Sequence, residues 1–128
     1  MKSKQKISRI LYVEDEDDLR DIVSVIIKKN FDIQIDALPS GNSAIEILES
    51  GITFDLIISD YRMPNGSGAD LQRYMKHAAI KTPFILYTST INPYLPEKSD
   101  QFLGVIEKSN WEKLLTLIQS TLKLFNGE

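Results

Sequence analysis

Five side chains with reactive or charged groups directly follow the apolar runs that are predicted to form β-strands. Glu14 and Asp15 follow the first run, and Asp60 follows the third. Thr88 follows the fourth run, and Lys108 follows the fifth. In an open parallel sheet, binding sites lie beyond the carboxyl ends of the strands, at the point where the strand order reverses. We therefore expect these side chains to meet at one edge of a sheet.

This set of side chains has the composition of a phosphoryl-transfer site. Clustered carboxylates repel one another, so they either take up protons or bind a cation. Oxygen ligands without histidine or cysteine suit a hard cation, which predicts Mg²⁺, with Mn²⁺ as the alternative. An ionised carboxylate is itself a nucleophile toward phosphorus. A metal ion and a lysine can then stabilise the charge on the transferred group.

Short apolar runs alternate with helical patterns along the chain, which predicts parallel strands joined by crossover helices. The first, third and fourth runs are continuously apolar, as expected of strands buried on both faces. The sequence therefore predicts an α/β fold with a doubly wound sheet of five strands. The predicted strands cover residues 10–13, 33–37, 55–59, 84–87 and 104–107.

Apolar residues spaced three and four apart predict buried stripes on the helices between the strands. In the last helix, Trp111 is expected to anchor the helix in the core, with a partner contact as the alternative. Ser109 is expected to form a capping box with Glu112. The connection between residues 90 and 103 contains Pro93 and Pro96, so a short or irregular helix is expected there. The four predicted stripes are Leu19, Ile22, Val23, Ile26 and Ile27; Ala44, Ile45 and Leu48; Leu71, Tyr74, Met75 and Ala78; and Trp111, Leu114, Leu115, Ile118, Leu122 and Phe125.

The length of 128 residues favours one domain over residues 1–128, with residues 1–6 as a flexible N-terminus. The chain has no cysteine, which excludes disulfides and thiolate metal sites. A net charge of −3 argues against direct binding of nucleic acid, which needs clustered lysine and arginine. The first apolar run is too short for a signal sequence, and no run is long enough to span a membrane. We expect a cytoplasmic protein without direct membrane contact.

Four stretches of the chain resemble the receiver domains of response regulators in two-component signalling. The most specific is the Asp-x-x-Met-Pro-x-x-x-Gly pattern, and the joint spacing of all four extends over almost the whole chain. The resemblance implies a flavodoxin-like receiver fold with the strand order 2-1-3-4-5. The four stretches cover residues 10–16, 60–68, 83–89 and 105–108.

The resemblance also implies the acceptor and the metal ligands. Asp60 resembles the phosphoacceptor of the family, which receives its phosphoryl group from a histidine kinase or a histidine phosphotransfer protein. Asp15, Asp60 and the main-chain carbonyl of Arg62 resemble the direct Mg²⁺ ligands. Glu14 is expected to act through a water molecule.

Two further residues and the mode of signalling are implied in the same way. Thr88 resembles the switch hydroxyl that follows the phosphoryl group, and Lys108 resembles the lysine that pairs with it. Such a domain is not an enzyme toward other substrates, because it catalyses only its own phosphorylation and dephosphorylation. It signals through a protein partner, for which the face built by the fourth helix, fifth strand and fifth helix of the family fold is expected.

The chain departs from the family pattern in its last third. Ser109 follows the lysine where the family usually has proline, often after a cis bond. Since a cis bond without proline costs about 3–4 kcal/mol, we expect either a trans bond or a strained exception, and either could move Lys108. Val105 replaces the usual aromatic switch residue, Ser89 replaces a smaller residue, and the proline-containing connection replaces a regular fourth helix. These departures predict intact phosphorylation chemistry and an altered readout.

Three other classes of protein fit the sequence less well. A phosphatase of the haloacid-dehalogenase type would need a second aspartate two positions after the first, where this chain has Arg62. A flavodoxin-like FMN binder would need a hydroxyl-rich phosphate loop, but the acidic run at residues 14–18 would repel phosphate. A degenerate receiver that only scaffolds a partner would not need Asp15, Asp60, Thr88 and Lys108 together.

Overall fold

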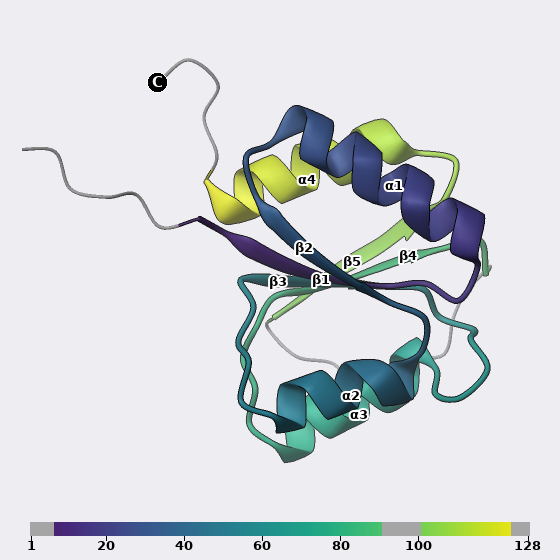
Figure 1. The fold of residues 1–128 in the computed structure, drawn as a ribbon, viewed down its shortest axis with the longest axis vertical. Helices are drawn as coiled ribbons and strands as arrows, with labels where there is room; N and C mark the ends of the chain where they lie inside the picture. The colour runs from purple at the N-terminus through teal and green to yellow at the C-terminus, as the bar shows by residue number, and fades with distance from the viewer. Residues whose placement is uncertain (1–6, 91–100, 124–128) are drawn as a thin grey trace, which may run out of the picture.

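The computed structural model describes residues 7–90 and 101–123. A five-stranded parallel sheet lies between two layers of helices, with α1 and α4 on one face and α2 and α3 on the other (Figure 1). The predicted doubly wound α/β fold is therefore confirmed. The elements are β1 (Arg9–Val13), α1 (Asp17–Asn30), β2 (Gln34–Leu38), α2 (Gly41–Glu49), β3 (Leu56–Ser59), α3 (Gly68–His77), β4 (Phe84–Thr88), β5 (Phe102–Glu107) and α4 (Trp111–Leu122).

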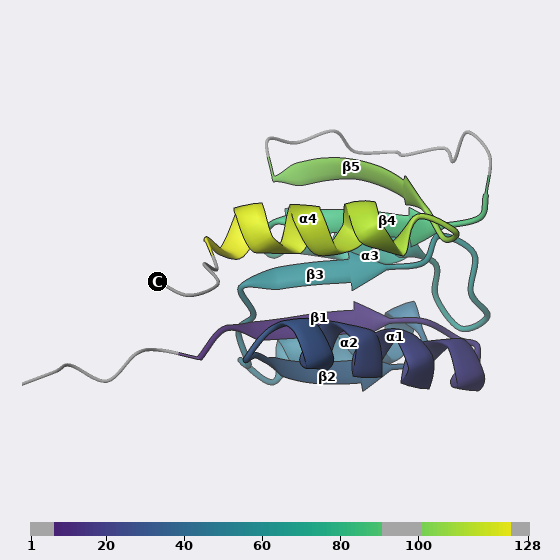
Figure 2. The same cartoon turned by 90° about the horizontal axis from the view of Figure 1, so that it is seen from above.

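The strands follow the order β2-β1-β3-β4-β5, which confirms the order implied by the resemblance (Figure 2). The chain runs from β1 outward to β2 and then returns past β1 to β3, so the order reverses between β1 and β3. Val13 at the end of β1 pairs with Ser59 at the end of β3. The residues that follow these two strands are therefore neighbours at the carboxyl edge of the sheet.

The apolar core consists of two clusters, one on each face of the sheet. Every residue of β3 and β4 is buried, and so are four of the five residues of β1, because these central strands are covered by helices on both sides. Successive side chains of a strand point to opposite faces, so Tyr12 contributes to the cluster under α1 and α4, while Leu11 and Val13 contribute to the other. This burial explains why the central strands read as continuous apolar runs.

The start of α4 differs from the sequence-based prediction. The expected capping box between Ser109 and Glu112 is wrong, since Asn110 is the N-cap and its Oδ1 accepts a hydrogen bond from the backbone N–H of Lys113, at 3.1 Å. The Ser109 hydroxyl instead donates to the Glu107 carboxylate, at 2.8 Å. The helix therefore begins one residue later than the predicted cap would place it.

Three apolar residues of the predicted buried stripes lie at the surface, namely Ile22, Ala78 and Trp111. Trp111 is 47% exposed, so its predicted role as a core anchor is wrong, and Leu114 and Ile118 bury the face of α4 instead. Ile22 is 56% exposed, while Val23 and Ile27 carry the buried stripe of α1. The 3.6-residue period allows only part of each predicted stripe to face the sheet, and the residues at the stripe's edge remain in contact with water.

Two expectations fall outside the described residues. They are the short or irregular helix near Pro93 and Pro96 and the flexible N-terminus at residues 1–6. Within the described residues, no helix combines the length and the apolar character that crossing a membrane requires.

Candidate functional site

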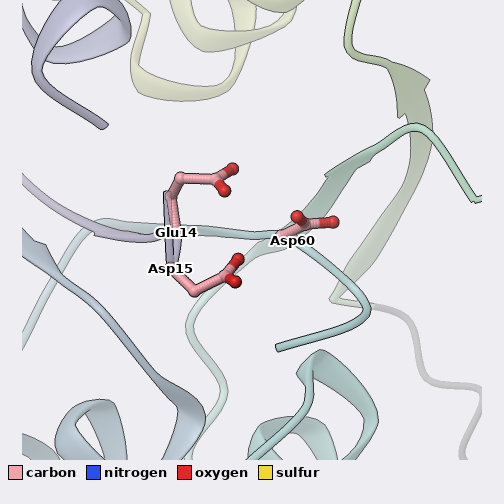
Figure 3. A group of neighbouring side chains, drawn as sticks. All are labelled: Glu14, Asp15 and Asp60. Atoms are coloured by element: carbon pink, nitrogen blue, oxygen red, sulfur yellow. The ribbon is translucent and has the colours of Figure 1, made fainter. Parts of the chain in front are cut away.

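Three carboxylates gather where the order of the strands reverses. Glu14 and Asp15 follow β1, Asp60 follows β3, and one carboxylate oxygen from each lies within 4.8 Å of the others. Figure 3 shows the three side chains converging from the ends of the two strands. Glu14 and Asp60 are buried, with 1% and 7% of their surface exposed, whereas Asp15 is exposed at the rim. The convergence predicted from strand-end positions is thus confirmed for these residues.

Lys108 joins the cluster from the end of β5. Its Nζ lies 2.7 Å from Oδ2 of Asp60 and 2.9 Å from Oε1 of Glu14, so one ammonium group pairs with two carboxylates. Only 17% of the Lys108 side chain is exposed. A lysine 48 residues from Asp60 in the sequence therefore reaches it because β4 alone separates β3 from β5 in the sheet.

The electrostatics of the cluster reflect burial and competition between like charges. Burial raises the pKa of Glu14, and repulsion by Asp60 acts in the same direction, against the hydrogen bonds from Lys108 and the Glu16 backbone N–H. Burial alone would disfavour the charged form of Lys108, but its hydrogen bonds with Asp60 and Glu14 outweigh that effect and raise the pKa of Lys108. The lysine is therefore a permanent cation that cannot neutralise three carboxylates by itself.

The cluster offers the donor set that a hard divalent cation prefers. All three acidic side chains present oxygen ligands, and neither histidine nor cysteine is among them. Two of the carboxylates are held nearly out of water, where uncompensated negative charge is costly. The residues at this edge of the sheet therefore fit a Mg²⁺ ion.

Thr88 lies at the same edge, at the end of β4. Ser59 of β3 pairs with Leu86 of β4, so Asp60 and Thr88 both extend beyond this pair. Thr88 is 2% exposed, and its hydroxyl oxygen accepts a hydrogen bond from the backbone N–H of Thr90, at 3.1 Å. This bond uses a lone pair of the oxygen, so the hydroxyl proton can point to another group.

The loop after β3 holds Asp60 and contains Arg62. Oδ1 of Asp60 accepts a hydrogen bond from the backbone N–H of Tyr61, at 2.6 Å. The Arg62 side chain is exposed, and its carbonyl belongs to the turn between Asp60 and α3. Its expected role as a main-chain metal ligand stays a prediction.

The departures around Lys108 do not remove it from the cluster. The Lys108–Ser109 peptide bond is trans, which is one of the two outcomes expected for a serine at this position. The backbone N–H of Lys108 donates to the Thr88 carbonyl, at 3.2 Å, which extends the pairing of β5 with β4. Val105, in the place of the family's aromatic switch, is 40% exposed, and Ser89 is exposed as well.

Gly68 is a supporting residue whose role here sequence reasoning missed. A Cβ at this position would lie 2.4 Å from the backbone oxygen of Asp60, and the Gly68 N–H donates to the Tyr61 carbonyl, at 2.8 Å. The start of α3 therefore packs directly against the backbone that carries Asp60. The glycine of the Asp-x-x-Met-Pro-x-x-x-Gly pattern is the only sequence signal for this contact.

A Gly68→Ala substitution is expected to destabilise the fold by about 1–3 kcal/mol, because the added methyl group meets backbone that cannot rotate away. Chemical denaturation would measure the change. Gly51→Ala is the matched control, since a Cβ there meets nothing within 4 Å and only its backbone angle φ of +94° opposes alanine. A Gly68→Ala variant as stable as the unsubstituted chain would contradict the close approach.

Known proteins resemble the chain in both sequence and fold. The sequence model of the family described as "Response regulator receiver domain" matches residues 10–118. The response regulator protein PilR of Pseudomonas aeruginosa is 29% identical over 98% of this chain, which spans 28% of the length of PilR. The two-component response regulator ORR5 of Oryza sativa is 30% identical over 73% of this chain and 75% of its own length.

Solved structures share the fold. The response regulator TrrA of Thermotoga maritima, determined in complex with Mg²⁺ and BeF, has a TM-score of 0.79 at 24% identity and covers 90% of this chain and 99% of its own. The receiver domain of the hybrid histidine kinase CckA has a TM-score of 0.72 at 23% identity and covers 90% of this chain and 99% of its own. Since the family model covers most of the sequence, this chain belongs to the response regulator receiver domain family of two-component signalling.

Proposed function

We propose that Asp60 accepts a phosphoryl group in a Mg²⁺-dependent reaction. The observation that carries this proposal is the buried Asp60 carboxylate, which lies beside Glu14 and Asp15 and is held by the Lys108 ammonium at 2.7 Å. A carboxylate that is paired with an ammonium group needs no general base to attack phosphorus. Its oxygen forms the new bond to phosphorus, and the donor leaves with the electron pair of the broken bond.

The metal ligands we propose are Asp15, Asp60 and the main-chain carbonyl of Arg62, with Glu14 acting through a water molecule. The oxygen-only donor set and the excess negative charge of the cluster support Mg²⁺, and Mn²⁺ is the alternative. TrrA was determined in complex with Mg²⁺ and BeF, which supports the same cation for this chain. The ion would neutralise charge that develops between the acceptor and the transferred group.

Lys108 and Thr88 are proposed to stabilise the phosphoryl group. The Lys108 ammonium already touches the acceptor carboxylate, so it can move with little displacement onto a phosphoryl oxygen. The hydroxyl of Thr88 is buried at the end of the neighbouring strand, from where it can donate to a second phosphoryl oxygen. Neither residue needs to gain or lose a proton in the transfer.

Membership of the family supports a proposal for the biological setting. We infer that the donor is a phosphohistidine on a histidine kinase or a histidine phosphotransfer protein, and that the phosphorylated state is passed to an output protein. We further propose a cytoplasmic location and a single domain over residues 1–128 that catalyses no reaction besides its own phosphorylation and dephosphorylation. The surface of β5 and α4, where Leu103, Val105 and Trp111 are exposed, supports a protein contact on that face.

The proposal is tested by incubating the protein with acetyl phosphate and measuring its intact mass, once with Mg²⁺ and once with EDTA. We expect a gain of one phosphoryl group only with Mg²⁺, and loss of that gain in neutral hydroxylamine, which cleaves acyl phosphates. Absence of the gain in a folded sample would favour the scaffold alternative. Repeated release of phosphate from a phosphoester would favour the phosphatase alternative.

A further inference from the structure

Tyr87 is a buried residue of β4 whose hydroxyl reaches the end of β5. It is 1% exposed, and its hydroxyl donates a hydrogen bond to the backbone carbonyl of Lys108, with an O–O distance of 2.6 Å. Tyr87 pairs with Ile106 in the register of the two strands, so the side chain extends along β5 to a point two residues further on. The bond therefore crosses from the strand that carries Thr88 to the residue that supplies the ammonium group.

A hydroxyl at this depth is costly unless it has a hydrogen-bond partner. Burial raises the pKa of Tyr87, so the phenol keeps its proton and remains a donor. Among the described residues, Tyr87 is the donor recorded for the Lys108 carbonyl. The buried hydroxyl and the carbonyl of the half-buried Lys108 thus satisfy each other.

Tyr12 provides an internal comparison on the same face of the sheet. It is 0% exposed and belongs to the same apolar cluster as Tyr87, but its hydroxyl has no hydrogen-bond partner among the described residues. Burial in this core therefore does not by itself give a tyrosine hydroxyl a hydrogen-bond partner. The hydrogen bond of Tyr87 depends on its place in β4, opposite β5.

The backbone of Lys108 needs such an anchor because the side chain must satisfy two acceptors at once. Its Nζ lies 2.7 Å from Asp60 and 2.9 Å from Glu14, whereas its own N–H bond to the Thr88 carbonyl is long, at 3.2 Å. A lysine side chain has four rotatable bonds, so a loose backbone would spread the ammonium over many positions. The hydrogen bond from Tyr87 holds the backbone carbonyl of Lys108 in place.

We propose that Tyr87 is a positioning residue for Lys108, which holds the lysine backbone so that its ammonium stays between Asp60 and Glu14. The inference rests on the proposed phosphorylation of Asp60. Tyr87 acts through Lys108, since within the described part of the chain its hydroxyl bonds to the Lys108 carbonyl and not to the acceptor carboxylate. It deepens the proposed function by adding a residue from the buried core to the site.

The test compares Tyr87→Phe with Tyr12→Phe, because each removes one hydroxyl oxygen from a buried ring. We expect Tyr87→Phe to slow phosphorylation by acetyl phosphate about tenfold at saturating Mg²⁺, while the affinity for Mg²⁺ changes less than about twofold. Tyr12→Phe is expected to leave both quantities unchanged. Equal rates for Tyr87→Phe and the unsubstituted chain would overturn the proposal.

A double-mutant cycle with Lys108→Ala separates positioning from a merely structural effect. Lys108→Ala keeps the backbone carbonyl, so Tyr87→Phe still removes the hydrogen bond in that background. If Tyr87 acts through the ammonium, Tyr87→Phe causes no further loss of rate there, whereas an independent structural effect would slow both backgrounds equally. The same cycle can be measured in the free energy of unfolding. It gives a coupling between Tyr87 and Lys108 even if the unsubstituted chain accepts no phosphoryl group. Failure of the proposed function and failure of this inference are thereby distinguished.

Discussion

The Asp60→Asn variant is expected to gain no phosphoryl mass under conditions in which the unsubstituted chain is phosphorylated. An amide oxygen is a far weaker nucleophile toward phosphorus than a carboxylate. Because Asp60 is buried, there is little room for another nucleophile to take its place. Loss of Asp60 as a proposed metal ligand should also weaken Mg²⁺ binding by at least about tenfold, since even outer partners of metal ligands contribute that much. Intact mass and a Mg²⁺ titration measure the two effects.

Asp36→Asn is the matched control for this variant. Asp36 is also a strand carboxylate that pairs with a cation, because Arg9 donates to it at 2.8 and 3.0 Å, but it lies in β2, away from the cluster. Its substitution should leave phosphorylation and Mg²⁺ binding unchanged. A phosphoryl gain that persists in Asp60→Asn would instead move the acceptor to Asp15 or Glu14.

The site could be predicted from the sequence because the carboxyl ends of parallel strands lie at one edge of the sheet. Each apolar run marks a buried strand, and the polar residue after it marks the point where the strand leaves the core. The sequence therefore predicts Asp60 and Glu14 as neighbours, although the pattern of apolar residues gives no distance between them. The reversal of order between β1 and β3 then brings the two together.

Helix ends and stripe edges were predicted less well, because they depend on small differences between competing partners. Ser109 has the right chemistry for an N-cap, but Glu107 offers its hydroxyl another acceptor and Asn110 takes the capping position. This shift places Trp111 at the first residue of α4, where it is 47% exposed. A pattern of apolar residues does not resolve a shift of one position.

Contacts across strands were not predictable, since they depend on register and side-chain reach. Tyr87 reads as one more apolar residue in a buried run, and only the pairing of β4 with β5 brings its hydroxyl to the Lys108 carbonyl. Gly68 reads as a loop residue, and only the fold brings it against the Asp60 backbone. Both supporting residues are therefore findings of the structure.

The Lys108→Ala variant is expected to lower the phosphorylation rate by about 100-fold, because it removes the cation that we propose to face the transferred group. In the absence of Mg²⁺ it should also destabilise the fold, since Glu14 and Asp60 lose the ammonium that compensates their buried charge. Breaking such a pair costs about 3–5 kcal/mol, and the lower end applies here because 17% of the lysine side chain is exposed. Acetyl phosphate kinetics and chemical denaturation measure the two effects.

Lys108→Met separates charge from packing, because methionine keeps an unbranched apolar stem while removing the ammonium. Its phosphorylation rate should fall by the same factor as that of Lys108→Ala. Mg²⁺ should restore much of the stability of both variants, since a ligand that binds only the folded state stabilises it. The affinity for Mg²⁺ is expected to rise in both variants, because the ammonium no longer repels a second cation from the carboxylates. General damage to the fold would lower rate and affinity together. A lower rate with a higher affinity therefore assigns the loss to the missing charge, and a rate within a few-fold of the unsubstituted chain would exclude Lys108 from the reaction.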